Sequence, residues 1–316
     1  MRIDSFAAPT MVTWQLTRDC NLACLHCCTD SAPGRALPGE LSRGRALSLA
    51  REIAAAGVPY AMIVGGEPTL APHFGEVCRA LSDGGVLLKI ETNGMAFDPG
   101  VLKGLRVRSV QISLDGASQE TYAKQRPGGD LAKVLATCRA VVAAGLPLEI
   151  TFAPTALNIR EVAQVIALAV EVGAFRFNTG RLMRLGTAAK LWDRLEPSEE
   201  QYACFRAALD ACRAPIELRY LPFSMEDELS GRKIEPSGTL LILPDGRVKV
   251  FAALPHTCAD LSKRAFLEAW DEYRKAWRDP RVRRALDLLA ARPELAADAN
   301  RWIALDLAPH DLPVVV

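Results

Sequence analysis

Short apolar runs alternate with longer segments of helical period over the first half of the chain. Between the runs, residues 41–57 and 130–145 repeat apolar side chains at the spacing of one helix face. Each run is therefore predicted to be a β-strand, and the intervening segments are predicted to contain helices. The six predicted strands are MVTWQLT from residue 11, YAMIV from 60, VLLKIE from 86, VRSVQIS from 107, LPLEITF from 146 and AFRFN from 174.

Alternating strands and helices favour a parallel sheet with right-handed crossovers. Six such units are fewer than the eight of a closed barrel. The sequence therefore predicts an α/β fold, an open partial (β/α)6 barrel whose active site lies at the carboxyl ends of the strands.

The pattern changes after Gly186. A helix over 197–212 precedes IELRYL, and TLLILPDGRVKVF is typical of two strands joined by a turn at Asp245 and Gly246. Two helical stretches follow, over 262–277 and 279–295. We therefore expect residues 1–186 to form the partial barrel and residues 187–316 to form a small α+β extension that covers the barrel mouth.

Composition narrows the range of partners. Half of the 316 residues are hydrophobic, and 38 basic residues stand against 37 acidic ones. A net charge of +1 gives no overall field that would recruit nucleic acid or a membrane surface. No run resembles a signal peptide or a membrane span. We expect a cytoplasmic protein whose partner is a small molecule or a peptide.

Four of the nine cysteines lie between positions 20 and 28. In a reducing compartment such a group indicates metal binding or catalysis rather than disulfides. Cys20, Cys24 and Cys27 follow the first predicted strand, and three thiolates would leave one iron of a cubane cluster open to an outside ligand. A zinc site is the alternative, with His26 or Cys28 as the fourth ligand.

The spacing CxxxCxxC after the first strand, with Gly65-Gly66-Glu67-Pro68 after the second, resembles the radical S-adenosylmethionine (SAM) superfamily. The resemblance extends over residues 11–186 and includes residues 91–94 and 113–116. It implies one [4Fe–4S] cluster on Cys20, Cys24 and Cys27, with Cys28 as a bystander. It also implies that SAM chelates the free iron and that one electron cleaves SAM to methionine and a deoxyadenosyl radical.

The GGEP motif has a physical task in such a site. Gly65 and Gly66 would let the backbone approach the methionyl end of SAM closely, and Glu67 would accept from its ammonium. Pro68 suits the turn that follows. The same four residues also suit an ordinary turn between a strand and a helix.

Polar residues at two further strand ends are predicted to contact SAM. Thr92 and Asn93 offer short hydrogen-bonding side chains, and Ser113 and Asp115 would hold the ribose or the carboxylate. Each is also a common turn former.

Arg126 stands where enzymes of the SPASM-containing branch carry an arginine. A guanidinium suits a bidentate grip on the SAM carboxylate, and a solvated surface arginine is the alternative. Leu182 and Met183, just after the sixth strand, are predicted to line the adenine, although apolar residues there are also typical of a core.

The last third of the chain resembles a SPASM or twitch extension that has lost its cluster ligands. Cysteines expected near Ser237 and Phe251 are absent, and Cys258 remains with Cys204 and Cys212 upstream. One cluster per chain and a redox-neutral reaction are therefore predicted. Cys258 is a candidate catalytic donor of a hydrogen atom to the substrate radical, or else a buried structural thiol.

Only about ten residues precede the first predicted strand. We expect no leader-binding domain there, and hence a small substrate such as a sugar, nucleoside or aminocyclitol, with flavodoxin or ferredoxin as the electron donor. A peptide maturase and a haem-modifying enzyme are the alternatives, the second because WQLTRDCNLACLHC and LPGEL are similar to that branch. A non-catalytic iron–sulfur protein is a fourth, more remote alternative.

Overall fold

One eleven-stranded sheet forms the centre of the computed structural model, which describes residues 3–305. The strand order is β11-β10-β9-β8-β1-β2-β3-β4-β5-β6-β7. Seven neighbouring strands are parallel: β1 (Met11–Gln15), β2 (Tyr60–Val64), β3 (Leu87–Thr92), β4 (Val107–Ser113), β5 (Leu148–Phe152), β6 (Arg176–Gly180) and β7 (Glu217–Leu221).

The six predicted strands are β1 to β6, and the predicted α/β class with a largely parallel sheet is confirmed. β7 was expected in the extension, but it pairs in parallel with β6, with Phe177 opposite Leu218. The connection over 181–216 is long and contains several helices, so the alternation of one strand with one helix could not be followed from β6 to β7 in the sequence. The division at residue 186 stays a prediction, and the parallel sheet continues beyond it.

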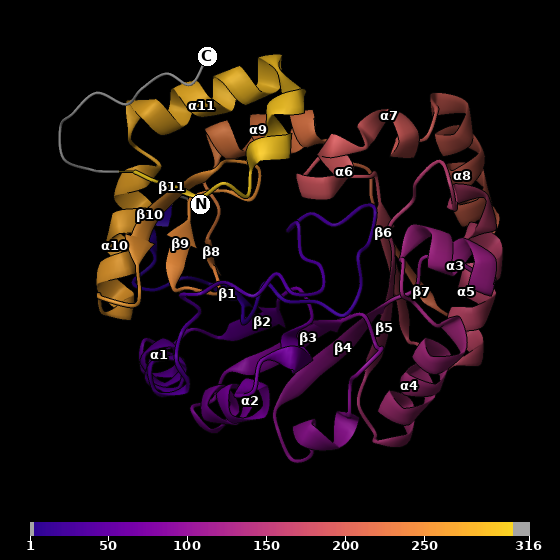
Figure 1. Cartoon of the computed structure of the whole chain (residues 1–316), viewed down its shortest axis with the longest axis horizontal. Helices are drawn as coiled ribbons and strands as arrows, with labels where there is room; N and C mark the ends of the chain where they lie inside the picture. The colour runs from indigo at the N-terminus through magenta and orange to yellow at the C-terminus, as the bar shows by residue number, and fades with distance from the viewer. Residues whose placement is uncertain (1–2, 306–316) are drawn as a thin grey trace.

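Helices cover the outer face of the parallel strands (Figure 1). They are α1 (Arg43–Ala55), α2 (Phe74–Asp83), α3 (Gln119–Gln125), α4 (Leu131–Ala143), α5 (Val162–Glu171) and α8 (Glu199–Ala211). Capping residues and glycines in the sequence set the ends of these helices. Asp130 accepts a hydrogen bond from the Lys133 amide at the start of α4, and Gly145, with φ of +74°, lies just beyond its last turn.

The two faces of the strands differ. Side chains such as Ile90, Ile112 and Ile150 are fully buried in the hydrophobic core. On the alternate positions the lumen is polar: Asn178 donates to Glu149 at 2.7 Å, and Gln111 donates to Glu91 at 2.9 Å. A period of two thus separates a core face from a hydrogen-bonded interior.

The last third of the chain extends the same sheet from its β1 side. β8 (Thr239–Ile242) is parallel to β1, and β9 (Arg247–Lys249) and β10 (His256–Asp260) continue it in antiparallel pairing, followed by a short parallel β11 (Ile303–Ala304). The predicted hairpin is confirmed, with Gly246 at φ of +86° in its turn. α9 (Met225–Ile234), α10 (Phe266–Ala276) and α11 (Pro280–Ala291) accompany these strands.

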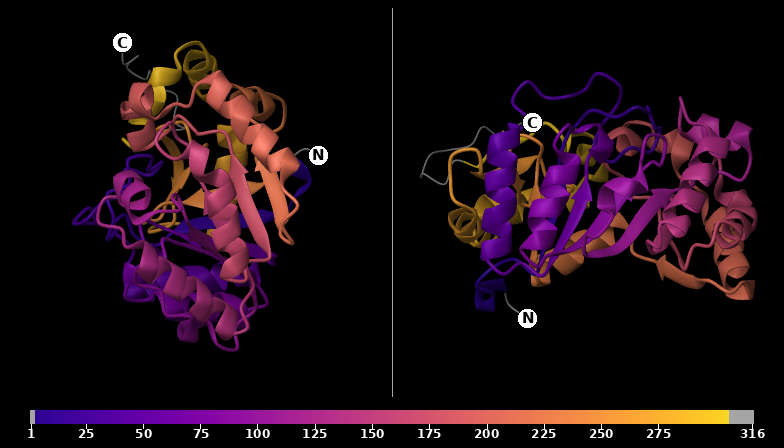
Figure 2. Two further views of the ribbon diagram at one scale, coloured as in Figure 1. Left: turned by 90° about the vertical axis from the view of Figure 1, so that its right-hand side faces the viewer. Right: turned by 90° about the horizontal axis from the view of Figure 1, so that it is seen from below.

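The sheet curls into an arc whose ends are bridged. α6 (Gly186–Lys190) packs against the 3-10 helix η5 (Pro293–Asp298), opposite β1 to β4 in Figure 1, and α7 (Trp192–Leu195) follows α6. The long loop after β1 runs inside this arc, and Figure 2 shows it at the end of the molecule away from the N-terminus. No helix within residues 3–305 is long and apolar enough to cross a membrane.

Candidate functional site

A cavity of about 480 Å³ lies at the carboxyl ends of the first strands. One wall is the cysteine loop, residues 16–42, which contains no helix and only an isolated bridge between Asp19 and Ala32. Predicted site residues on the cavity wall are Cys20, Cys24, Cys27, Gly65, Gly66, Thr92, Asn93, Ser113 and Arg126. The fold thus brings most of the predicted site together. A larger depression between α1 and α2 contains none of these residues.

Each of the three thiols has a donor group beside its sulfur. The side-chain amide nitrogen of Asn93 lies 3.6 Å from Cys20 Sγ, and Arg126 Nη1 lies 3.4 Å from Cys24 Sγ. The backbone amide of Ser31 lies 3.3 Å from Cys27 Sγ. Burial raises the pKa of Cys24 to about 12, and the charge of Arg126 opposes this shift. Donors at the sulfurs stabilise the thiolate form, which is the form that binds metal.

The arrangement does not suit a single metal ion. Within residues 3–305 no group of three His, Cys, Asp or Glu side chains is close enough to hold one. His26, the proposed fourth zinc ligand, is engaged through both ring nitrogens, with Gln125 at 2.8 Å and Asp115 at 3.0 Å. Three separated thiols on one cavity wall do fit a cubane, because a cubane takes each thiolate on a different iron.

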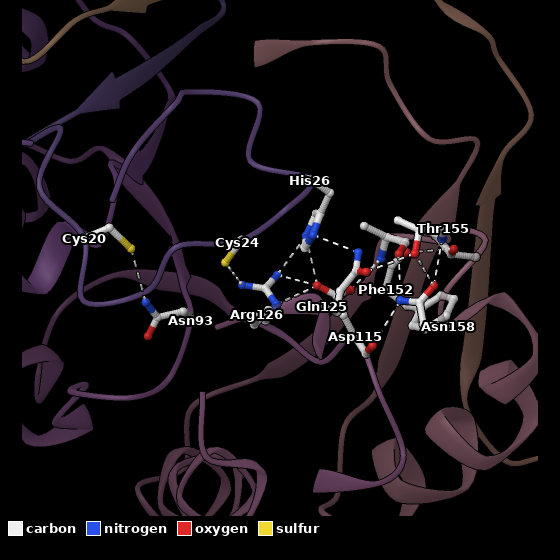
Figure 3. Close-up of polar contacts among 12 residues, drawn as sticks. Cys20, Cys24, His26, Asn93, Asp115, Gln125, Arg126, Phe152, Thr155 and Asn158 are labelled. Atoms are coloured by element: carbon white, nitrogen blue, oxygen red, sulfur yellow. Dashed lines mark hydrogen bonds and ion pairs between the residues drawn. The ribbon is translucent and has the colours of Figure 1, made fainter. Parts of the chain in front are cut away.

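A buried ion pair anchors the loop on the side of Cys24 (Figure 3). Asp115 is fully buried, and its Oδ2 accepts from Arg126 Nε at 2.6 Å, while Oδ1 accepts from the Ala153 amide. Burial raises the pKa of Asp115, but Arg126 and His26 outweigh burial and hold the pKa well below its usual range.

Asp115 therefore does not have its predicted role of holding the SAM ribose or carboxylate, because it is fully buried, does not line the cavity and accepts from Arg126, His26 and the Ala153 amide. Arg126 does reach the cavity, 8% exposed. Its Nε and Nη2 face Asp115, Nη2 also lies 3.4 Å from His26 Nε2, and Nη1 lies beside Cys24, so all three nitrogens already have protein partners. The bidentate grip predicted for Arg126 is not available in this arrangement.

Glu67 differs from its predicted role in the same way. Its fully buried carboxylate accepts from the Thr69 hydroxyl, the Thr92 hydroxyl and the Asn93 amide, each at 2.8 Å. Burial raises its pKa against the effect of these donors. Glu67 thus ties the GGEP turn to the end of β3, and its fully buried side chain does not line the cavity where it would meet the ammonium of SAM. Pro68 is buried in the same turn and does not line the cavity.

Gly66 is required by a close backbone contact. A β-carbon placed on Gly66 would lie 2.1 Å from the carbonyl oxygen of Asp19, and one on Gly65 would lie 3.0 Å from that of Thr17. The Gly66 amide donates to Thr17 O at 2.8 Å, and the Glu67 amide donates to Asp19 O at 2.9 Å. GGEP therefore supports the backbone that leads into Cys20, besides lining the cavity.

Residues that follow β6 in the sequence also hold the cysteine loop. The Thr187 amide donates to Cys27 O at 2.8 Å, and Asn300 Nδ2 donates to Cys28 O at 2.9 Å and to Asp30 at 3.0 Å. Gly186 has φ of +54° and packs against the carbonyls of Cys27 and Cys28. The cysteine loop is thus fixed by both halves of the sequence.

Three other predicted residues lie away from the cavity wall. Leu182 is buried in a small cluster with Ala188 and Leu195, and Met183 packs against the main core. Cys258 is buried on β10, where its thiol donates to Val248 O at 3.6 Å. Leu182 and Met183 therefore do not line an adenine site in this cavity, and Cys258 is not placed to reach a substrate there.

Three charged residues of the cavity were not predicted as site residues, and one of them is Arg232 on α9. Glu91 on β3 and Lys249 on β9 are the other two. Burial raises the pKa of Glu91 and lowers that of Lys249 to about 7. For Glu91 and Lys249 the only sequence signal was the alternation of charged with apolar residues in the strand runs VLLKIE and GRVKV.

An α/β partial barrel whose first loop brings three thiols to a cavity at the strand ends is the architecture of an iron–sulfur enzyme. Residues 14–169 match the family model of the radical SAM superfamily, and the chain belongs to that superfamily. The cofactors of this family are a [4Fe–4S] cluster and SAM, in agreement with the prediction.

Three curated proteins are similar to parts of this chain. The mycofactocin maturase MftC of Mycobacterium ulcerans is 36% identical over 61% of this chain and 53% of its own length. The AdoMet-dependent heme synthase of Methanosarcina barkeri is 32% identical (61% and 56%), and the PqqA peptide cyclase of Ruegeria pomeroyi is 30% identical (61% and 53%). The chain thus spans about half the length of the curated relatives it matches.

Among solved structures, Streptococcus suis SuiB bound to the precursor peptide SuiA has a TM-score of 0.67 at 13% identity, over 85% of this chain and 66% of SuiB. At this identity the likeness concerns the fold. The curated relatives, which are named as a maturase, a heme synthase and a peptide cyclase, overturn the expected small sugar-like substrate. That expectation rested on the few residues before the first strand, and such a count does not distinguish peptide-modifying relatives from others.

Replacement of Gly66 by alanine is predicted to destabilise the site. The added methyl group would meet Asp19 O at 2.1 Å, and overpacking of this kind costs about 1–3 kcal/mol. The matched control is Gly231→Ala in α9, where no heavy atom outside the helix's own backbone lies within 4 Å of the added methyl group. Alanine there is expected to be neutral or stabilising by about 0.5–1 kcal/mol. Urea unfolding of the metal-free proteins measures both changes, and equal stability of the two variants would contradict the close contact.

Proposed function

We propose that this protein is a radical SAM enzyme that modifies a peptide. Cys20, Cys24 and Cys27 would hold one [4Fe–4S] cluster and leave its fourth iron open to the cavity. When bound there, the cluster and SAM supply a deoxyadenosyl radical that removes a hydrogen atom from the substrate. The observation that carries the proposal is the meeting of these three separated thiols with Gly65 and Gly66 on one cavity wall.

The chain's own residues contribute positioning and electrostatics. Asn93, Arg126 and the Ser31 amide donate toward the three sulfurs and so stabilise their anionic form. Gly65 and Gly66 leave room for the methionyl end of SAM next to the backbone. Thr92 and Ser113 line the same wall, and the Thr92 hydroxyl donates to Glu67, which fixes its orientation.

A single cluster is part of the proposal, with residues 187–316 as a degenerate SPASM or twitch extension. The three cysteines there lie apart: Cys204 is exposed on α8, Cys212 follows the end of that helix, and Cys258 is buried on β10. A cytoplasmic location, where flavodoxin or ferredoxin could donate the electron, suits the nine free cysteines.

The peptide substrate is supported by the activities for which relatives are named, a maturase and a peptide cyclase among them. A second candidate is a tetrapyrrole. The observation that favours it is the heme synthase of Oleidesulfovibrio alaskensis, whose alignment at 26% identity extends over 88% of this chain and 79% of its own length.

The cluster ligands are tested by single alanine variants after anaerobic reconstitution. Wild type and the Cys28→Ala variant are predicted to bind about four irons and four sulfides, and loss of Cys20, Cys24 or Cys27 is predicted to abolish SAM cleavage. Iron near eight per chain would contradict the single cluster. Retention of the cluster by Cys27→Ala with loss in Cys28→Ala would contradict the ligand assignment.

The substrate class is tested by substrate-dependent cleavage of SAM. Deuterated short peptides encoded beside the gene, and deuterated tetrapyrroles with propionate side chains, are incubated with loaded enzyme, SAM and dithionite. We expect a peptide to transfer deuterium into deoxyadenosine, since the radical removes a hydrogen atom from its substrate. Transfer from the tetrapyrrole alone would instead establish the second candidate. The variant lacking all three ligand cysteines is the control and should give no deoxyadenosine.

A further inference from the structure

Lys249 is a buried cation with no carboxylate partner. It is 2% exposed. Among the described residues, Lys249 is the only buried lysine and Arg126 is the only buried arginine. Arg126 is paired with Asp115 at 2.6 Å. Lys249 Nζ instead donates to the carbonyl of Ala252 at 2.7 Å and to Asn300 Oδ1 at 3.4 Å, and no carboxylate within residues 3–305 forms an ion pair with it.

The nearest acidic group on this side is already engaged. Asp30 contributes to the field at Lys249 but accepts from the Lys190 ammonium at 2.8 Å and from Asn300 and Thr187. Asn300 stands between Asp30 and Lys249, so their contact is indirect. Two neutral oxygens leave one of the three N–H donors of an ammonium without a protein acceptor.

The side chain of Lys249 faces the cavity rather than the core. It lines the same cavity as the cysteine loop, together with Glu91 and Arg232, and Arg232 is paired with Glu228. The charge of Arg126 acts on Cys24, whereas that of Lys249 acts on Cys28, four residues further along the loop. The cavity therefore has two buried cations that act on different cysteines of the loop, and a third cation, Arg232, that already has a carboxylate partner.

Burial of an ammonium without a counter-ion is costly, and this cost lowers the pKa of Lys249 to about 7, so that the side chain is only partly charged near neutral pH while it lacks an anionic partner. A bound anion would remove this cost, and a carboxylate is the anion that a peptide offers. We propose that Lys249 binds a carboxylate of the substrate, from either its C-terminus or an acidic side chain, and so determines which part of the peptide enters the cavity. This rests on the proposed function, because it deepens the substrate class.

The test measures binding and needs no turnover. Three tripeptides are titrated into cluster-loaded, SAM-bound protein: acetyl-Ala-Ala-Phe as the free acid, the same peptide as the amide, and acetyl-Ala-Asp-Phe amide. Wild type is expected to bind at least one of the two charged peptides about tenfold more tightly than the neutral amide, as one charge-assisted hydrogen bond would give. The charged peptide that is preferred identifies the C-terminus or the side chain as the source of the carboxylate.

Lys249→Met should remove this preference, because methionine keeps most of the side-chain volume without the charge. Lys249→Arg should restore part of it, which a merely structural lysine would not explain. The matched control is Lys263→Met, whose lysine side chain is 79% exposed, and it should bind as wild type does. Iron content and SAM binding should be unchanged in all three variants.

Five results would overturn the assignment. Equal binding of the three peptides by wild type, or a preference that survives Lys249→Met, would show that the ammonium does not select a carboxylate. Loss of SAM binding in Lys249→Met would show that the carboxylate is that of the cofactor, and loss of iron that Lys249 balances the charge of the cluster. Absence of binding by all three peptides would instead count against the peptide substrate, and both conclusions would fall together.

Discussion

Three thiols must be held apart around one cavity by a loop that has almost no secondary structure of its own, and the rest of the site depends on this constraint. Two buried carboxylates at strand ends meet it. Asp115 holds Arg126 and His26 beside Cys24, and Glu67 joins the GGEP turn to Thr92 and Asn93, whose amide reaches Cys20. Because both carboxylates are fully buried and accept hydrogen bonds from protein groups, they act as fixed supports. The motif residues therefore shape the site as much as they contact a cofactor.

The two halves of the sequence share this task. Backbone contacts from Gly66 and Glu67 fix the start of the loop, and Thr187 and Asn300 fix its end. The strand pairing between β1 and β8 places Lys249 on the wall that faces the barrel strands. The cavity thus has a side built by the superfamily's barrel and a side built by the last third of the chain, and the second side is where this protein can differ from its relatives in substrate.

Sequence periodicity was sufficient for the fold class, for six of the seven strands β1 to β7 and for the hairpin, because these elements follow local patterns of apolar residues and turn formers. It also placed the cysteines and strand-end motifs at one cavity. It could not give the direction of a side chain or the use of its hydrogen-bonding capacity. Glu67 and Asp115 stand at motif positions, yet tertiary contacts use their oxygens. Leu182, Met183 and Cys258 were placed by proximity in sequence, and Lys249 was missed because its importance lies in the absence of a carboxylate beside it.

The central claim is that three cysteines leave one iron of a cubane open to SAM. Mössbauer spectroscopy of protein reconstituted with iron-57, recorded with and without SAM, tests it most directly, since a ligand that binds one iron alters the environment of that iron alone. If one iron is open to SAM, one iron in four is expected to change its isomer shift when SAM is added. Four irons that remain equivalent and unchanged, or a spectrum of a single mononuclear site, would contradict it.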